Sequence, residues 1–469
     1  MKPYLPYLAL FGVAALSSYL ACFPISALAR RIGAVDQPGE GRMHALPTPI
    51  AGGGAMLVAF LISMFVASRV HTFGGIFRTS LEPLGVIIGA ILIYLVGLID
   101  DVRDISAPAK VAGQVLAAMA LVSLGVTMFY FKIPFYAPII NLSPSELPLI
   151  TALWVVGMAN AVNLIDGLDG LAAGIVAIAS GSLCVYGLRL EHLGDLAPDS
   201  IGPLVALIAC GVCIGFLPHN FHPARLFMGD GGALFLGLLM AAATMVIGGR
   251  TESSSSQPIH VSGLTFFRFA PLFLPFFILG VPILDTAFAI VRRTARRSSF
   301  AARDLGHLHH RLVRLGHGQR RAVLILWSWT AVLSAFVLIP VFDNRANAYV
   351  PVGLAVLGVG LYTLFHPAGT PTEAPVLTAE GVPLAPPGEV EPTRPRHGRS
   401  GPPISVTVSG AAGVAVAGEP DLASPTRRRR VRRRVPRLAL RRPRHSGEAP
   451  LPTSDPAGRV APNEGEVRG

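Results

Sequence analysis

One stretch of this sequence combines aspartate, asparagine and glycine at the edge of a long apolar segment. In NAVNLIDGLDGLAAG, Asn160 and Asn163 are three residues apart, as are Asp166 and Asp169. On a helix that ends in a glycine-rich turn, side chains at this spacing converge on one patch. Carboxylate and amide oxygens are the ligands that Mg²⁺ accepts, usually with water and substrate phosphate. The stretch therefore predicts a magnesium site.

Further acidic residues lie in comparable surroundings. Asp100 and Asp101 end an apolar segment in GLIDDVRD. Because adjacent carboxylates repel, such a pair needs a cation, a shared proton or full solvation. Asp230 lies between glycines in FMGDGGALFLG, where a helix begins and its N-terminus favours phosphate. The alternatives without chemistry are a solvated helix end for the pair and helix capping for Asp230.

A cluster of imidazoles lies farther along the chain, in HLHHRL. It contains His307, His309 and His310, followed by Arg311. No cysteine is near, and arginine beside histidine suits phosphate oxygens through charge-assisted hydrogen bonds. We expect this cluster to bind a diphosphate; transition-metal binding and a plain surface loop are the alternatives.

The elements that must position these side chains are membrane-spanning helices. The chain has 469 residues, 52% hydrophobic and 14% charged, and its mean hydropathy is +0.56. Soluble domains carry about 25% charged residues, so the composition predicts an all-α polytopic membrane protein. Spans need roughly 17–25 apolar residues. We count about eleven, near residues 4–28, 50–69, 83–99, 109–128, 147–163, 170–189, 200–217, 232–248, 269–291, 322–341 and 347–365.

With eleven spans, the loops that follow the odd-numbered spans share one side of the membrane. These loops carry all the stretches described above, together with DQPGEGRMHALPTPIAGG at residues 36–53 and RRTARR at residues 292–297. Arginine next to spans is enriched on the cytoplasmic side. We therefore expect the chemistry to lie at the cytoplasmic face.

After about residue 367 the composition changes to proline, glycine, glutamate, threonine and arginine. Few large hydrophobic residues remain, so we expect a disordered tail at 367–469 after a membrane domain at 1–366. The tail contains RRRRVRRRVPRLALRRPRH, which holds much of the excess behind the net charge of +12. We expect this run to lie in the cytoplasm beside anionic lipid; nucleic-acid binding is the alternative.

Magnesium-type acids, phosphate-binding groups and glycine-rich turns at a membrane boundary suit phosphoryl transfer between a soluble nucleotide and a lipid. In these stretches the chain resembles the polyprenyl-phosphate N-acetylhexosamine-1-phosphate transferases, the superfamily of WecA, TagO and MraY. The resemblance covers about residues 1–365 and rests on DQPGEGRMHALPTPIAGG, LIDDVRD, NAVNLIDGLDGLAAG, HPARLFMGDGGALFLG, PILDTAFAIVRR and DLGHLHHRL, in family order. GHLHHRL and an eleventh span are similar to the WecA and TagO branch.

The resemblance implies an activity and its partners. Such an enzyme moves GlcNAc-1-phosphate from UDP-GlcNAc to undecaprenyl or decaprenyl phosphate and releases UMP, in the first membrane step of cell-envelope glycan assembly. It uses Mg²⁺, with Mn²⁺ as an alternative, and is a multi-pass protein of the bacterial plasma membrane. Membrane lipid and a second copy of the chain in a homodimer are further partners to consider, and we expect no nucleic acid.

The resemblance also implies roles for single residues. Catalysis is implied for three aspartates, Asp100, Asp101 and Asp166. Metal binding is implied for Asn163 and Asp230. Contact with uracil is implied for Asp169 and for the ring of Phe227. Further substrate contacts, mostly to diphosphate and sugar, are implied for Asn160, His307, His309, His310 and Arg311.

Two alternatives stay open at this point. One is an MraY-like transferase that uses UDP-MurNAc-pentapeptide. The other is a polytopic transporter or lipid-binding scaffold without catalysis. Transporter acids lie near the bilayer midplane, whereas the acids of this chain lie at the edges of its apolar segments. This position favours an enzyme.

Overall fold

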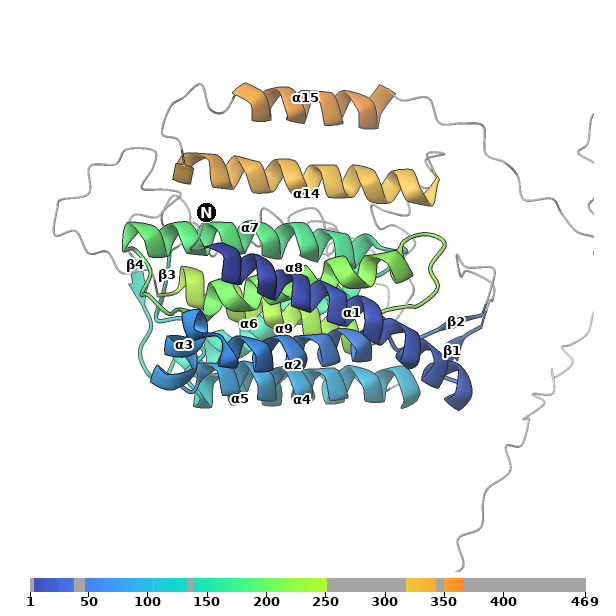
Figure 1. The fold of residues 1–469 in the computed structure, drawn as a ribbon, viewed down its shortest axis with the longest axis horizontal. Coiled ribbons are helices and arrows are strands. Elements are labelled where there is room, and N and C mark those ends of the chain that lie inside the picture. Colours follow the sequence, from blue (N-terminus) through green and yellow to red (C-terminus); the bar gives the residue numbers. More distant parts are fainter. Residues whose placement is uncertain are drawn as a thin grey trace, which may run out of the picture. The chain divides into compact units, whose positions relative to one another are not determined.

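The computed structural model of the chain describes residues 4–37, 47–103, 105–132, 139–250, 318–342 and 350–365. All of these residues belong to one compact unit, Met1–Ala385, and most of them are helical (Figure 1). The expected span near 269–291, the histidine cluster at 307–311 and the tail at 367–469 lie outside the described residues.

The described helices follow the apolar segments closely. Eight are long and apolar enough to cross a membrane: α1 (Leu5–Ile32), α2 (Gly52–Arg69), α4 (Glu82–Arg103), α6 (Leu147–Ile165), α7 (Leu171–Leu193), α8 (Ile201–Asn220), α9 (Gly229–Gly248) and α14 (Gln319–Phe342). Three are shorter: α3 (Gly74–Thr79), α5 (Ala107–Ser123) and α15 (Val350–Phe365). The prediction of a helical, polytopic membrane protein is confirmed, whereas the count of eleven spans stays a prediction.

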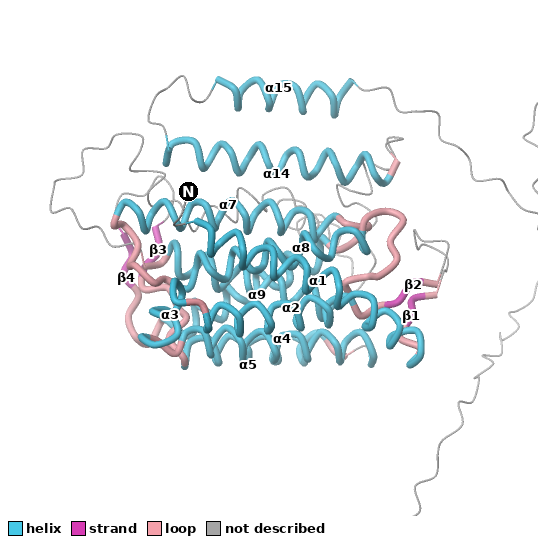
Figure 2. The backbone as a smooth tube through the Cα atoms, viewed as in Figure 1, coloured by secondary structure: helices cyan, strands magenta, loops and turns pink. Residues whose placement is uncertain are grey.

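Two short antiparallel ribbons are a departure from the predicted all-α fold. Strands β1 (Val35–Asp36) and β2 (Thr48–Pro49) form one ribbon, and β3 (Tyr130–Lys132) and β4 (Ile139–Asn141) form the other. The ribbons lie at opposite ends of the helices, with β1 and β2 on the right in Figure 2. One ribbon lies in the connection between α1 and α2, and the other in the connection between α5 and α6.

Helix α9 lies at the centre of the packing. Each of its residues from 231 to 248 is buried, and it contacts α2, α4, α6 and α8. Hydrophobicity gives little drive for association between helices in lipid, so close contact relies on small residues. A Cβ atom on Gly97 of α4 would collide with the backbone nitrogen of Gly231, and one on Gly53 of α2 would collide with that of Gly232. Glycine thus allows α2 and α4 to approach the start of α9.

The contact between Gly97 and α9 can be tested by substitution. Gly97→Ala overfills it, and overpacking costs about 1–3 kcal/mol, so the melting temperature of the purified protein in detergent should fall. Gly157→Ala, in α6, is the matched control because no atom lies within 4 Å of the added Cβ. Equal melting temperatures for the two variants would contradict the packing account.

Candidate functional site

The described candidate residues lie mainly at one end of the helices. Asp100 and Asp101 are in the last turn of α4, Asn163 is in the last turn of α6, and Asp230 is in the first turn of α9. In Figure 1 this is the end that carries β1 and β2. The C-termini of two helices and the N-terminus of a third therefore bring distant parts of the sequence together.

Lys110, in the first turn of α5, joins two of these carboxylates. Its Nζ atom lies 2.8 Å from Oδ2 of Asp100 and also pairs with Oδ2 of Asp230. The side chains of Lys110 and Asp100 are only 16% and 13% exposed, so water screens their charges weakly. The backbone N–H of Ile105 donates to the other oxygen of Asp100 at 3.0 Å. One ammonium group thus faces carboxylates from both α4 and α9.

Asp101 and Asn163 complete the surroundings of Asp230. Asp101 accepts hydrogen bonds from the backbone N–H groups of Asp230 at 2.9 Å and of Gly231 at 3.2 Å. These donors have no partner inside α9 because they belong to its first turn. The amide nitrogen of Asn163 donates to Oδ1 of Asp230 at 2.9 Å. The amide oxygen of Asn163 accepts no hydrogen bond from the described residues and can face a ligand.

Asp166 directly follows α6 and lies near the other carboxylates of the cluster. Burial raises its pKa, and the nearby charges of Asp230, Asp101 and Asp169 raise it further, to about 7. A carboxyl group whose pKa lies near neutrality can gain or lose a proton under working conditions. Asp166 is therefore suited to accept a proton beside the side chains of Asp101 and Asp230.

Asp169 and Asn160 face other neighbours. Oδ2 of Asp169 lies 2.7 Å from Nδ1 of His222 and accepts the backbone N–H of Ala224 at 3.1 Å. The amide nitrogen of Asn160 donates to Oε1 of Gln114 at 2.7 Å. Asp169 is therefore bound to the segment between α8 and α9, and Asn160 to α5. The four side chains therefore have different partners, although Asp166 lies close enough to Asp169 and Asp230 for their charges to raise its pKa.

Phe227 lies three residues before Asp230, and its backbone is fixed by the chain around β2. Its N–H donates to the carbonyl of Pro49 at 2.9 Å, and its carbonyl accepts the N–H of Gly52 at 2.8 Å. These bonds connect DQPGEGRMHALPTPIAGG to FMGDGG. They hold the residue implied to stack on uracil at a fixed position beside the start of α9.

The donor atoms of the cluster suit a hard divalent cation. Among the described residues, no three His, Cys, Asp or Glu side chains already surround one point as a metal site. Mg²⁺ seldom has such a cage, because it binds through one or two carboxylates with water and substrate phosphates. Asp230 and the amide oxygen of Asn163 fit that pattern. Lys110 provides the positive charge beside Asp230 here, so a divalent cation would compete with it.

Sequence reasoning missed Lys110, Gln114 and His222. The chain has only three lysines, and Lys110 is the one that begins a long apolar segment just after an aspartate pair. That rarity was a usable signal. His222 begins HPARLFMGDGGALFLG, one of the stretches that carry the resemblance, but its partner Asp169 could not be predicted because it comes from another loop. Gln114 gave no signal, because its partner Asn160 lies on another helix.

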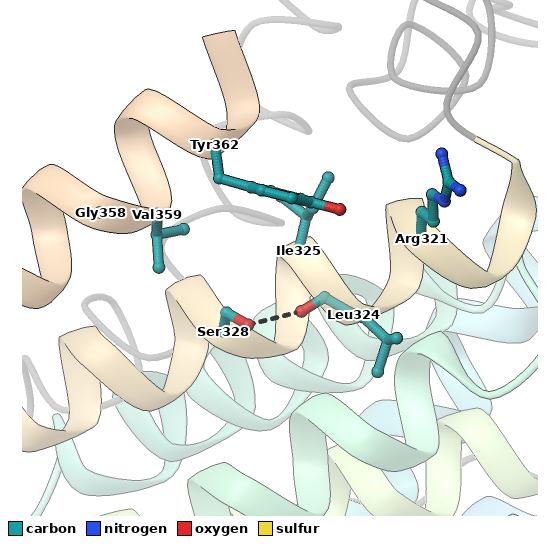
Figure 3. A pocket seen from close by; sticks show the side chains of 7 residues that line it. All are labelled: Arg321, Leu324, Ile325, Ser328, Gly358, Val359 and Tyr362. Atoms are coloured by element: carbon teal, nitrogen blue, oxygen red, sulfur yellow. Dashed lines mark hydrogen bonds between the residues drawn. The ribbon is translucent and has the colours of Figure 1, made fainter. Parts of the chain in front are cut away.

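A separate groove of about 300 Å³ lies between α14 and α15 (Figure 3). Its lining consists of Arg321, Leu324, Ile325, Ser328, Gly358, Val359 and Tyr362. Figure 3 shows the hydroxyl of Ser328 bonded to the carbonyl of Leu324 in its own helix, at 2.8 Å. None of the candidate residues lines this groove, and it offers no carboxylate. The groove therefore shares no residue with the carboxylate cluster.

Comparison with known proteins identifies related chains. The profile of glycosyl transferase family 4 matches residues 83–248, which contain every described candidate residue. Decaprenyl-phosphate N-acetylglucosaminephosphotransferase of Mycobacterium tuberculosis is 39% identical over 367 residues, 76% of this chain and 88% of that protein. The probable undecaprenyl-phosphate N-acetylglucosaminyl 1-phosphate transferase of Bacillus subtilis is 35% identical, over 65% of this chain and 76% of that one. Phospho-N-acetylmuramoyl-pentapeptide-transferase of Desulforudis audaxviator is 32% identical, over 61% and 82%.

Competition between Lys110 and a divalent cation can be tested without an activity assay. Lys110→Met removes the ammonium group between Asp100 and Asp230 but keeps much of the side-chain volume. We expect a lower melting temperature without divalent cations, because the two carboxylates then repel each other. Added Mg²⁺ should stabilise this variant more than the wild type. Lys110→Arg keeps the charge and is the control; equal responses of all three proteins to Mg²⁺ would refute the competition.

Proposed function

Because the chain belongs to the polyprenyl-phosphate N-acetylhexosamine-1-phosphate transferases, within glycosyl transferase family 4, we propose that it transfers GlcNAc-1-phosphate from UDP-GlcNAc to a polyprenyl phosphate. The products are UMP and polyprenyl-diphospho-GlcNAc, and the reaction begins the assembly of a cell-envelope glycan. The acceptor would be undecaprenyl or decaprenyl phosphate. One similar protein is named as a decaprenyl-phosphate transferase and another as a probable undecaprenyl-phosphate transferase, so both acceptors should be assayed.

The observation that carries the proposal is the carboxylate cluster around Lys110 at the ends of apolar helices. A nucleotide sugar dissolves in water, and a polyprenyl phosphate places its chain in the bilayer and its phosphate at the surface. Only a site at the edge of the membrane can reach both reactants. Carboxylates at that edge can organise phosphates through a cation, which suits phosphoryl transfer.

Asp230 and Asn163 are the residues that would hold Mg²⁺, or Mn²⁺ as the alternative. When bound, this cation would neutralise charge that develops on the diphosphate during transfer of the phosphoryl group. Lys110 adds a fixed positive charge beside Asp100 and Asp230. An oxygen of the lipid phosphate attacks the β-phosphorus of UDP-GlcNAc, and UMP leaves.

Three aspartates are proposed as catalytic, Asp100, Asp101 and Asp166. Asp166 suits removal of a proton from the lipid phosphate, because its pKa is raised to about 7. Asp101 holds the first turn of α9 and thereby fixes the position of Asp230. Asp100 keeps Lys110 beside the cluster.

Substrate contacts are proposed around this centre. Asp169 and Phe227 would bind uracil, through a hydrogen bond and ring stacking respectively. Asn160, on α6, would make a further contact with the substrate. The diphosphate and sugar would contact residues that lie outside the described part of the chain, His307, His309, His310 and Arg311.

The two alternative functions are less well supported. A pentapeptide transferase that is 32% identical is named among the similar proteins, but the GlcNAc-phosphate transferases of Mycobacterium tuberculosis and Bacillus subtilis match with higher identity, 39% and 35%. For a transporter, the acids should lie near the middle of the spans. In this protein Asp100, Asp101 and Asp230 lie in terminal turns, which favours catalysis at the membrane surface.

The finer topology is part of the proposal. We place eleven spans in a bacterial plasma membrane, with the carboxylate cluster at the cytoplasmic face. The catalytic unit would end near residue 366. The arginine-rich tail at 367–469 would be disordered in the cytoplasm, beside anionic lipid, without a part in the chemistry.

A transfer assay with purified full-length protein tests the activity. Wild-type protein should transfer label from UDP-GlcNAc, and not from UDP-MurNAc-pentapeptide, to polyprenyl phosphate. Asp230→Asn should lower the rate at least about 100-fold, because loss of one group that stabilises charge has effects of that order. Asp199→Asn, the same change in the loop between α7 and α8, should keep the rate. Near-normal turnover by folded Asp230→Asn would remove Asp230 from the mechanism, and transfer of the pentapeptide donor would favour the alternative.

Single introduced cysteines test the orientation. Ser145 is exposed at the end of the helices that carries β4, and Gly318 is exposed beside the start of α14. In intact cells, an impermeant thiol reagent should label Ser145→Cys, while Gly318→Cys should react only after the membrane is permeabilised. The unmodified chain is the background control, since its cysteines lie within helices of the membrane unit. Labelling of Gly318→Cys from outside would reverse the proposed orientation.

A further inference from the structure

Asp169 is held by the protein through only one of its two carboxylate oxygens. Oδ2 lies 2.7 Å from Nδ1 of His222 and 3.1 Å from the backbone nitrogen of Ala224, and both nitrogens can donate to it. Oδ1 accepts no hydrogen bond within the described part of the chain. The side chain is only 12% exposed. One oxygen is therefore fixed, and the other is left for a ligand.

His222 is in turn held by the start of α14. The Nε atom of Arg320 donates to the carbonyl oxygen of His222 at 3.0 Å. Arg320 is the second residue of α14, so this helix reaches Asp169 through one intermediate residue. The neighbouring Arg321 faces elsewhere, because it lines the groove between α14 and α15 (Figure 3).

The backbone around His222 has its own support. Oδ1 of Asn220 accepts the N–H of Gly170 at 3.0 Å, and its amide nitrogen donates to the carbonyl of Leu226 at 3.1 Å. Asn220 is buried. It joins the residue after Asp169 to the segment that contains His222. A substitution of His222 therefore tests the role of its side chain alone, because the hydrogen bonds of Asn220 still hold the loop in place.

We propose that His222 is a positioning residue that aims the carboxylate of Asp169 at the nucleotide base, and that Arg320 secures His222 from α14. The proposal rests on the proposed function, in which Asp169 contacts uracil. Uracil presents an N3–H donor, whereas N3 of cytosine is an acceptor. A carboxylate oxygen held in one orientation can accept the first and repels the second. His222 would thus support both nucleotide affinity and the choice of base.

Two substitutions separate the hydrogen bond from the imidazole ring. His222→Leu removes the donor to Asp169, and we expect the KM for UDP-GlcNAc to rise about tenfold, which corresponds to about 1.4 kcal/mol. The kcat value should change little, because the cluster around Lys110 is untouched. His222→Asn places an amide N–H close to the position of Nδ1 and should restore most of the affinity.

The role of Arg320 has a matched control in the next residue. Arg320→Met removes the donor to the His222 carbonyl, and it should raise the KM in the same direction, about threefold. Arg321→Met makes the same change of charge on the adjacent residue and should leave the KM unchanged. Equal effects of the two substitutions would show that charge alone matters and would overturn the contact proposed for Arg320.

Equilibrium binding of UMP and CMP to the purified full-length protein distinguishes the outcomes. Wild type should bind UMP in preference to CMP, and His222→Leu should lose much of both the affinity and the preference. If wild type binds neither nucleotide, the proposed function itself fails. If wild type prefers UMP and His222→Leu binds both nucleotides as wild type does, only the positioning role fails. Loss of binding by His222→Asn as severe as in His222→Leu would overturn the hydrogen-bond account.

Discussion

Ionised carboxylates at the edge of a bilayer are costly unless positive charge or hydrogen-bond donors replace the water that they lose. Lys110 supplies the charge for Asp100 and Asp230, and the first backbone N–H groups of α9 supply the donors for Asp101. Each interaction joins different helices. The carboxylates can therefore be kept together only if the C-terminus of α4 lies beside the N-termini of α5 and α9.

An ion pair also joins α4 and α9 at their opposite ends. Arg250 follows α9 and pairs with Glu82 at the start of α4, and its Nε donates to the carbonyl of Thr127 at 2.9 Å. Between the two ion pairs, Gly97 allows the backbones of α4 and α9 to meet. Charges at both ends and close contact between them restrict sliding of one helix along the other. Such sliding would move Asp230 away from Lys110, so the packing of the whole span maintains the geometry of the cluster.

Length and hydropathy were enough to predict the spans now seen as α1, α4, α6 and α9, because a helix in lipid must satisfy its own backbone and remain apolar. The contacts between helices could not be predicted in the same way. Asn160 and Asn163 are three residues apart and thus about 60° apart around α6. That difference is enough for one to face α5 and the other α9. Asp169 lies beyond the end of α6 at Ile165, so helical spacing does not apply to it. Its partner His222 follows from the tertiary fold alone.

In the proposed function, one short stretch contacts several parts of a nucleotide sugar, and the turn between α6 and α7 makes this arrangement possible. Asn163 reaches Asp230 from the last turn of the helix, and Asp169 reaches His222 after the chain has left that helix. A diphosphate and a base are separated by a ribose, so groups that contact both must themselves be separated. In a continuous helix, Asn163 and Asp169 would project from one axis in directions about 120° apart, because six residues turn through about 600°. The glycines of the turn release Asp169 from that axis, and Asn220 then fixes Gly170 in its new position. The sequence NLIDGLDG thus separates the group proposed to bind the cation from the group proposed to bind the base, by ending a helix between them.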